Sequence, residues 1–352
     1  MARTLALIAL LLVAAGCGGG HKARPAQPPG PPAPAGSGAS DFAGVYADDV
    51  FFGDASYKRA AAAQLRAAGV GIVRQPFAWS DFEKSPAPYD AFVGALARQG
   101  IHVLPMVLGP QPGGAPAGQG AMEPPSSAAA YARYAVALVH RYGPKGSFWR
   151  SNPGIPRVPI RSWQIWNEPN IPAFWGGKPD PGAYARLLAA AAPAIRKADP
   201  GAEIVAAGLP FSHLGPPAPA FLDALYAAGA KGTFDTVAVH AYARKPAAVL
   251  GRVRSVRRVI AAHGDDAKLW ITEFGWGTGG KPGPLTVTPA RQATYLSETL
   301  ALIGKDRAAL GLRGAVVFQW RDPKPYPGRR EIWPFYAGLL DVDGKPKPGL
   351  AA

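Results

Sequence analysis

Two glutamates of the 352-residue chain occur in apolar segments where a packing role is hard to assign. Glu168 follows the segment SWQIWN over 162–167 and precedes Pro169, and Glu273 lies within LWITEFGW over 269–276. A carboxylate buried without a partner costs free energy or shifts its pKa, so a salt-bridged glutamate is the structural alternative in each place. Together, one protonated and one ionised carboxyl group can cleave a glycosidic bond.

The elements that must position these acids alternate along the chain. From residue 41 onward, β-branched or aromatic segments alternate with Ala-rich segments of helical period, which indicates an α/β fold with parallel strands. We predict eight strands, over 44–47, 71–75, 101–108, 162–167, 203–208, 236–242, 269–274 and 315–320. We predict seven helices, over 57–68, 91–99, 127–142, 181–197, 219–228, 247–262 and 289–304.

This order predicts a (β/α)8 barrel, a TIM barrel, as a single domain over 41–352. The alternative fold is a doubly wound open sheet. Such a fold normally has a glycine-rich turn after its first strand, and the segment ADDV over 47–50 is not glycine-rich. Thr288 and Asp180, each followed by proline, predict helix N-caps. Residues 338–352 leave room only for a short or absent final helix.

Both acids stand near the carboxyl ends of predicted strands, the end at which barrel enzymes keep their sites. Strand alternation alone would point Asn167 and Glu168 to opposite faces. We therefore expect a kink or bulge there, beside Pro169, which has no N–H for the ladder. Glu273 shares parity with Ile271, and we expect both to point into the barrel.

The segments around the two acids carry a family resemblance. Asn167-Glu168-Pro169 and the segment ITEFGW over 271–276 resemble the acid/base and nucleophile strands of retaining glycoside hydrolases of the clan A superfamily, cellulase-like and β-xylosidase-like. The likeness in strand order covers most of 41–352. It implies that Glu168 is the general acid/base and Glu273 the nucleophile in hydrolysis of a β-linked oligo- or polysaccharide. Such carboxyl groups lie about 5 to 5.5 Å apart and form a covalent glycosyl-enzyme intermediate.

The same resemblance implies supporting roles for four more residues. Asn167 would hydrogen-bond the sugar 2-hydroxyl. Arg74, at the end of the second predicted strand, would lie beside Glu273 and keep it ionised, although a lone arginine could equally lie on the surface. His240 and Tyr242 share a face at the end of the sixth predicted strand, and such a tyrosine orients the nucleophile in the family.

Six tryptophans fall at or just beyond predicted strand ends: Trp79, Trp166, Trp175, Trp276, Trp320 and Trp333. Indole faces stack on the C–H faces of sugars, although packing is the commoner use of tryptophan. Trp320 matches the family's platform under the reacting sugar, and we predict that role for it.

Other barrel chemistries lack their residues. The six histidines form no H-x-H or H-E-x-x-H pair, so we predict no metal site and no cofactor. Lys268, the nearest candidate for a Schiff base, stands at the polar start of a strand. Two alternative functions stay open: a lectin that binds glycans without cleaving them, and a transglycosylase in which a sugar resolves the intermediate.

The N-terminal segment has the layout of an export signal. Arg3 precedes the apolar run 5–15, whose 11 residues are too few to span a bilayer, and a short buried helix is the alternative. The only cysteine, Cys17, ends a segment AAGC that resembles the lipobox of bacterial lipoproteins, which implies a signal over 1–17 and a lipidated Cys17. The Pro/Gly/Ala-rich segment 18–40 predicts a disordered tether. We expect an exported protein, lipid-anchored to the bacterial cell envelope or otherwise secreted.

The composition is that of a globular protein, since 48% of the residues are hydrophobic. The formal net charge of +15 raises the question of an anionic partner, either nucleic acid or lipid. The densest basic run, over 252–258, alternates with valines at helical spacing, which predicts the outer face of an amphipathic helix. We therefore expect no nucleic-acid partner, and a monomeric catalytic domain.

Overall fold

The computed structural model describes residues 40–109, 122–326 and 329–352. The predicted signal with Cys17, and the predicted tether apart from its last residue, lie outside the described residues.

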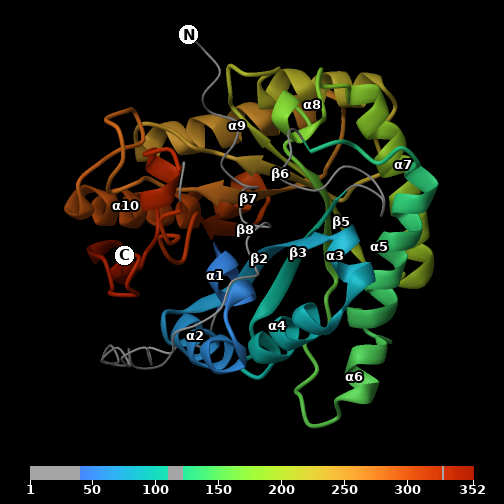
Figure 1. Ribbon diagram of the computed structural model, residues 1–352. Coiled ribbons are helices and arrows are strands. Elements are labelled where there is room, and N and C mark those ends of the chain that lie inside the picture. The colour runs from blue at the N-terminus through green and yellow to red at the C-terminus, as the bar shows by residue number, and fades with distance from the viewer. Residues whose placement is uncertain (1–39, 110–121, 327–328) are drawn as a thin grey trace.

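Eight parallel strands close into a barrel in the order of the sequence (Figure 1). They are β1 (Ser40–Tyr46), β2 (Val70–Ala78), β3 (His102–Leu108), β4 (Ser162–Asn167), β5 (Glu203–Pro210), β6 (Thr236–His240), β7 (Lys268–Phe274) and β8 (Leu312–Val317). The barrel closes because β1 also pairs with β8. Each predicted strand overlaps one observed strand, and the (β/α)8 prediction is confirmed.

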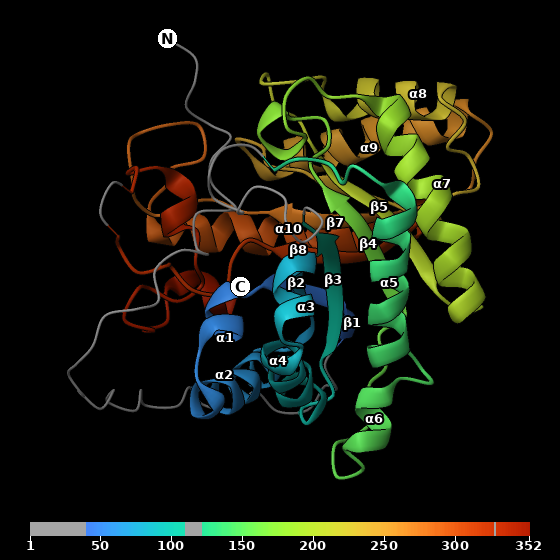
Figure 2. The same ribbon diagram turned by 45° about the vertical axis from the view of Figure 1, so that its right-hand side comes forward.

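The seven predicted helices are all present and surround the barrel (Figures 1 and 2). They are α2 (Ala55–Ala67), α4 (Ala87–Ala97), α5 (Ala128–Tyr142), α7 (Pro181–Ala198), α8 (Ala218–Ala227), α9 (Pro246–Ala262) and α10 (Pro289–Leu310). Short elements lie between them: α1 (Asp48–Phe52), α3 (Trp79–Lys84), α6 (Ser147–Ser151) and the 3-10 turn η1 (Pro172–Phe174). After β8 the described chain forms only the turns η2 (Trp333–Tyr336) and η3 (Pro348–Ala351), so the final helix is missing as predicted.

The helix starts follow the predicted capping chemistry. Thr288 Oγ1 accepts a hydrogen bond from the Arg291 N–H at 3.2 Å. Asp180 Oδ1 accepts one from the Ala183 N–H at 2.9 Å. Each bond satisfies a backbone donor that a helix start leaves unpaired.

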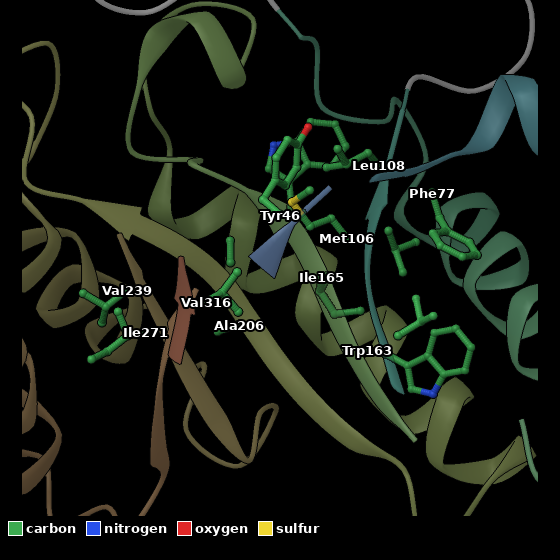
Figure 3. Packing of buried hydrophobic residues seen from close by; sticks show 14 of the residues in the cluster. Tyr46, Phe77, Met106, Leu108, Trp163, Ile165, Ala206, Val239, Ile271 and Val316 are labelled. Atoms are coloured by element: carbon green, nitrogen blue, oxygen red, sulfur yellow. The ribbon is translucent and has the colours of Figure 1, made fainter. Parts of the chain in front are cut away.

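Strand alternation divides the apolar side chains between two packing regions. One small cluster, contributed by five strands, consists of Ile72, Leu104, Val205, Ala238 and Trp270. A larger cluster combines strand residues such as Val239 and Ile271, which lie side by side in Figure 3, with apolar residues of the helices. The ladder between β6 and β7 keeps this alternation as far as Val239 and Ile271.

The predicted amphipathic helix is α9. Val253 and Val256 are buried on its inner side, whereas Arg258 is exposed. Arg254 forms an ion pair with Asp306 of α10. Arg254 and Arg258 therefore lie on a solvated helix face, whereas Arg252 and Arg257 are partly buried. None of the helices in the described ranges is both long enough and apolar enough to cross a membrane.

Candidate active site

The end of β4 is kinked, and the kink brings Asn167 and Glu168 to one site. Trp166 and Glu168 have φ angles of 69° and 47°, the left-handed region that side chains other than glycine rarely adopt. The backbone therefore departs from strand alternation on both sides of Asn167. The expected kink is present, and it begins three residues before Pro169.

Glu273 reaches the site by a different device, a bulge in β7. Val239 pairs with Ile271, but the next residue of β6, His240, pairs with Glu273, so that Thr272 is an extra residue on β7. Glu273 thus joins the face of His240, opposite the face of Ile271. The expectation that Glu273 shares the face of Ile271 is wrong. Side chains two residues apart share a face only in a regular strand, and the inserted Thr272 interrupts that alternation.

Arg74 of β2 is the centre of the site and is 0% exposed. Its guanidinium donates to Glu273 Oε1 at 2.6 Å, to Asn167 Oδ1 at 2.8 Å and to Gln164 Oε1 at 2.9 Å. Three acceptors from two strands therefore satisfy a buried cation. Gln164 was missed by the sequence analysis, although a polar side chain inside the apolar segment of β4 was the available signal.

Tyr242 completes the surroundings of Glu273. Its hydroxyl donates to Glu273 Oε2 at 2.7 Å, while Arg74 binds the other oxygen. Burial, followed by the charge of Glu273, raises the pKa of Tyr242 well above its usual range, so the hydroxyl keeps its proton. Each carboxylate oxygen of Glu273 thus has one fixed donor, which sets the orientation of the group.

Glu168 is held by His240. Burial, and then the charge of Arg74, lower the pKa of His240 well below its usual range, so the ring is neutral. His240 Nε2 lies 3.3 Å from Arg74 Nη2 and equally far from Glu273 Oε1. Because Arg74 can only donate and already binds Glu273 Oε1, we assign Nε2 as an acceptor and place the ring proton on Nδ1. His240 Nδ1 therefore donates to Glu168 Oε1, 2.6 Å away.

The environment of Glu168 favours its protonated form. Burial, followed by the negative charge of Glu273, raises the pKa of Glu168 well above the ordinary 4.5, and Arg74 opposes this only in part. The two glutamates have opposite surroundings: Glu273 is paired with a cation, and Glu168 is bound by a neutral ring.

Gly208 of β5 makes room for this arrangement. A Cβ atom at residue 208 would lie 2.1 Å from His240 Nε2, so any larger residue would displace the ring. The Gly208 carbonyl also accepts the Glu168 N–H at 3.1 Å, which fixes the kinked backbone. No signal in the sequence singled out this glycine among 43.

One ligand atom from each of Glu168, His240 and Glu273 lies within 4.8 Å of the others, a grouping that resembles a metal site. The Arg74 guanidinium already binds Glu273 Oε1 and contacts His240 Nε2, so a metal ion would have to displace a buried cation. The three side chains therefore fit a pair of carboxyl groups with their supports better than a metal site.

The aromatic side chains depart from the prediction. Trp320 is 1% exposed, and a sugar platform needs an exposed ring face, which Trp320 does not present. Instead, the rings of Phe318 and Trp333 have centroids 6.1 and 4.9 Å from that of Tyr242. Of the six tryptophans singled out above, five are buried, and Trp333 alone is partly exposed.

We compared the chain with known protein families, curated proteins and solved structures. No protein-family model matches the chain, and no curated protein matches it. Solved structures do match. A family 39 glycoside hydrolase from Bacteroides cellulosilyticus shares 21% identity at a TM-score of 0.63, over 88% of this chain and 62% of that one. A GH53 catalytic domain from Ignisphaera aggregans shares 17% identity at a TM-score of 0.59, over 91% of this chain and 97% of that one.

A GH5_18 protein from Bifidobacterium longum subsp. infantis shares 15% identity at a TM-score of 0.63, over 88% of this chain and 76% of that one. This chain thus spans less than two thirds of the length of the Bacteroides protein. At such identities the matches establish the barrel fold, which these glycoside hydrolases share with this chain.

Proposed function

We propose that the protein is a retaining glycoside hydrolase that cleaves β-linked oligo- or polysaccharides. The observation that carries this proposal is the paired setting of the two glutamates. Oxygens of Glu168 and Glu273 lie within 4.8 Å of each other, close to the separation of about 5 to 5.5 Å between carboxyl groups that suits a covalent mechanism. An inverting enzyme needs about 6.5 to 9.5 Å, to leave room for a water molecule.

In the first step of the proposed reaction, a Glu273 oxygen attacks the anomeric carbon while the bond to the leaving oxygen breaks. Glu168 gives its proton to that oxygen, so the alcohol leaves neutral and the sugar stays bound to Glu273 as an ester. Arg74 and Tyr242 support this role, because Arg74 binds one oxygen of Glu273 and Tyr242 donates to the other, so together they orient the attacking carboxylate. His240 supports the role of Glu168 by occupying Oε1, which leaves Oε2 to carry the transferable proton.

In the second step Glu168, now a carboxylate, accepts a proton from water as the oxygen of that water attacks the anomeric carbon. The bond between sugar and Glu273 breaks, and Glu168 is protonated again. Asn167 would donate its amide N–H to the sugar 2-hydroxyl, since its carbonyl oxygen is already bound by Arg74. A sugar hydroxyl in place of water would give transglycosylation by the same path.

Chemical rescue tests the two roles separately. We expect Glu273→Ala and Glu168→Ala each to lower kcat for aryl β-glycosides by several orders of magnitude. Azide should restore turnover in both. Because azide enters from opposite faces of the sugar, the product should be an α-glycosyl azide with Glu273→Ala and a β-glycosyl azide with Glu168→Ala.

A lectin would behave differently. It would bind members of a glycan panel without releasing reducing ends, and wild type and Glu273→Ala would be indistinguishable in turnover. That result would overturn the proposed hydrolase.

A further inference from the structure

Asp48 is a partly exposed acid that the proposed reaction does not use. It is the first residue of α1 and follows β1 at the carboxyl ends of the strands, the end that also carries Glu168 and Glu273. Tyr46 OH donates to Asp48 Oδ2 at 2.5 Å, and Gln75 Nε2 donates to Asp48 Oδ1 at 2.8 Å. Each carboxylate oxygen has accepted one hydrogen bond and can accept another.

Two short paths connect Asp48 to the nucleophile. The Tyr46 ring stacks on Phe318 with centroids 5.3 Å apart, and Phe318 contacts Tyr242, whose hydroxyl binds Glu273. The charge of Arg74, which binds Glu273, also acts on the Asp48 carboxyl and lowers its pKa. Asp48 is therefore fixed by side chains adjacent to those that fix Glu273, and it is itself partly exposed.

The charge of Asp48 is costly to the fold. Its pKa is raised to about 6, chiefly by burial and in smaller part by the charge of Asp49, although the hydrogen bonds from Tyr46 and Gln75 and the charge of Arg74 oppose this rise. Because the folded protein disfavours the ionised form, the carboxylate destabilises the protein at pH 7. Asparagine would fit the same space. Gln75 Oε1 has no partner among the described residues, and a rotated Gln75 amide could accept a hydrogen bond from an asparagine amide.

A charge that the fold does not need, held rigidly at the reacting end of the barrel, suggests a ligand. We propose that Asp48 accepts hydrogen bonds from sugar hydroxyls and selects a neutral sugar over a uronic acid. This inference rests on the proposed hydrolase. Hydroxyl donors bind a carboxylate by charge-assisted hydrogen bonds, whereas the carboxylate of a uronic acid would be repelled by a second negative charge.

The test uses 4-nitrophenyl β-glycosides of glucose, galactose, mannose, xylose and glucuronic acid on the full chain. For the best neutral substrate, we expect Asp48→Asn to lower kcat/KM by about 10- to 100-fold, the range of a hydrogen bond to a charged group. The preference for that substrate over the glucuronide should fall. At pH 7 the Tm should rise, and this gain should shrink from pH 6 toward pH 4, where the wild-type carboxyl is protonated in the folded protein.

Asp49→Asn is the matched control, with the same change of charge one residue later. Asp49 binds the Tyr57 hydroxyl, so we expect this variant to keep the wild-type preference.

Asp48→Glu is a second variant, which keeps the charge but moves it by one methylene. It should lose activity and still reject the glucuronide.

The outcomes separate the two proposals. If wild type hydrolyses aryl β-glycosides but Asp48→Asn keeps the preference for the neutral sugar, the role of Asp48 is overturned and the hydrolase stands. If wild type hydrolyses none of the five substrates or of a polysaccharide panel, both proposals fall.

Discussion

The two glutamates of the candidate site have different surroundings. Glu273 contacts the guanidinium of Arg74 and a tyrosine hydroxyl, whereas Glu168 is buried against a neutral histidine and faces the charge of Glu273. The charge of Glu273 therefore helps Glu168 to keep its proton, as the proposed reaction requires. Each glutamate depends on the other for its assigned role.

The pH dependence of kcat/KM should report this coupling. The proposed reaction requires protonated Glu168, and the raised pKa of Glu168 predicts that the basic limb of the profile lies well above pH 4.5. For a phenyl β-glycoside, kcat/KM should fall as the pH rises through that limb. A dinitrophenyl β-glycoside, whose leaving group needs no proton, should lose the limb. The same limb with both substrates would contradict the assignment of Glu168.

At the residue scale, residue type and strand context selected Glu168 and Glu273, and the family resemblance added Asn167, Arg74, His240 and Tyr242. The structure brings these six residues together. Trp320 was misjudged, because a motif does not say which of several rings keeps an exposed face. Gln164 and Gly208 were missed for another reason. Gln164 stood out only as a polar residue in an apolar strand, and nothing local marked Gly208, because their importance comes from contacts with Arg74 and His240 on other strands.

At the element scale, the periodic spacing of apolar residues predicts the strands and helices. The two places where a strand departs from regular alternation position the acids of the candidate site. The kink around Asn167 and the extra residue Thr272 both turn an acid to the face where the other side chains meet. The kink could be predicted from the sequence, because regular strand alternation would have placed Asn167 and Glu168 on opposite faces. The extra residue could not be predicted, because an inserted residue in β7 appears only when the strand is paired with β6.

The turn η2 is the element that supplies an exposed ring to the site. Trp333 packs edge-on against Tyr242 and remains partly exposed. We expect Trp333→Ala to raise KM for an oligosaccharide by up to about 10-fold, because an aromatic stacking contact contributes about 0.5–1.5 kcal/mol. Trp333→Phe should fall between wild type and Trp333→Ala. An unchanged KM in Trp333→Ala would remove η2 from the substrate site.

At the scale of the whole molecule, the barrel separates its two ends. The strands start on one face, where Ser40 pairs with Val70 and where the Arg307 guanidinium lies 4.1 Å from the Phe42 ring. The paired acids lie at the opposite, carboxyl end. The closed barrel could be predicted from the sequence, because eight strand segments follow one another along the chain. The last residue of each strand could not be predicted, because it depends on pairing with the neighbouring strands.

We further propose that Cys17 is lipidated and that the chain is an exported lipoprotein. In a bacterial host, wild type should sediment with the membranes and incorporate labelled fatty acid. Cys17→Ser should do neither. Its kcat on a soluble aryl glycoside should match that of detergent-solubilised wild type, because Glu168 and Glu273, which we propose as the catalytic pair, both lie in the barrel. Membrane retention of Cys17→Ser would count against the lipid anchor.

The place where the chain enters the barrel has a practical consequence. Anything fused or coupled ahead of Ser40 joins the molecule at the face where β1 begins, away from Glu168 and Glu273. Beads or a carrier protein linked through that end should leave the reaction centre turned toward the bulk liquid, accessible even to insoluble glycan particles.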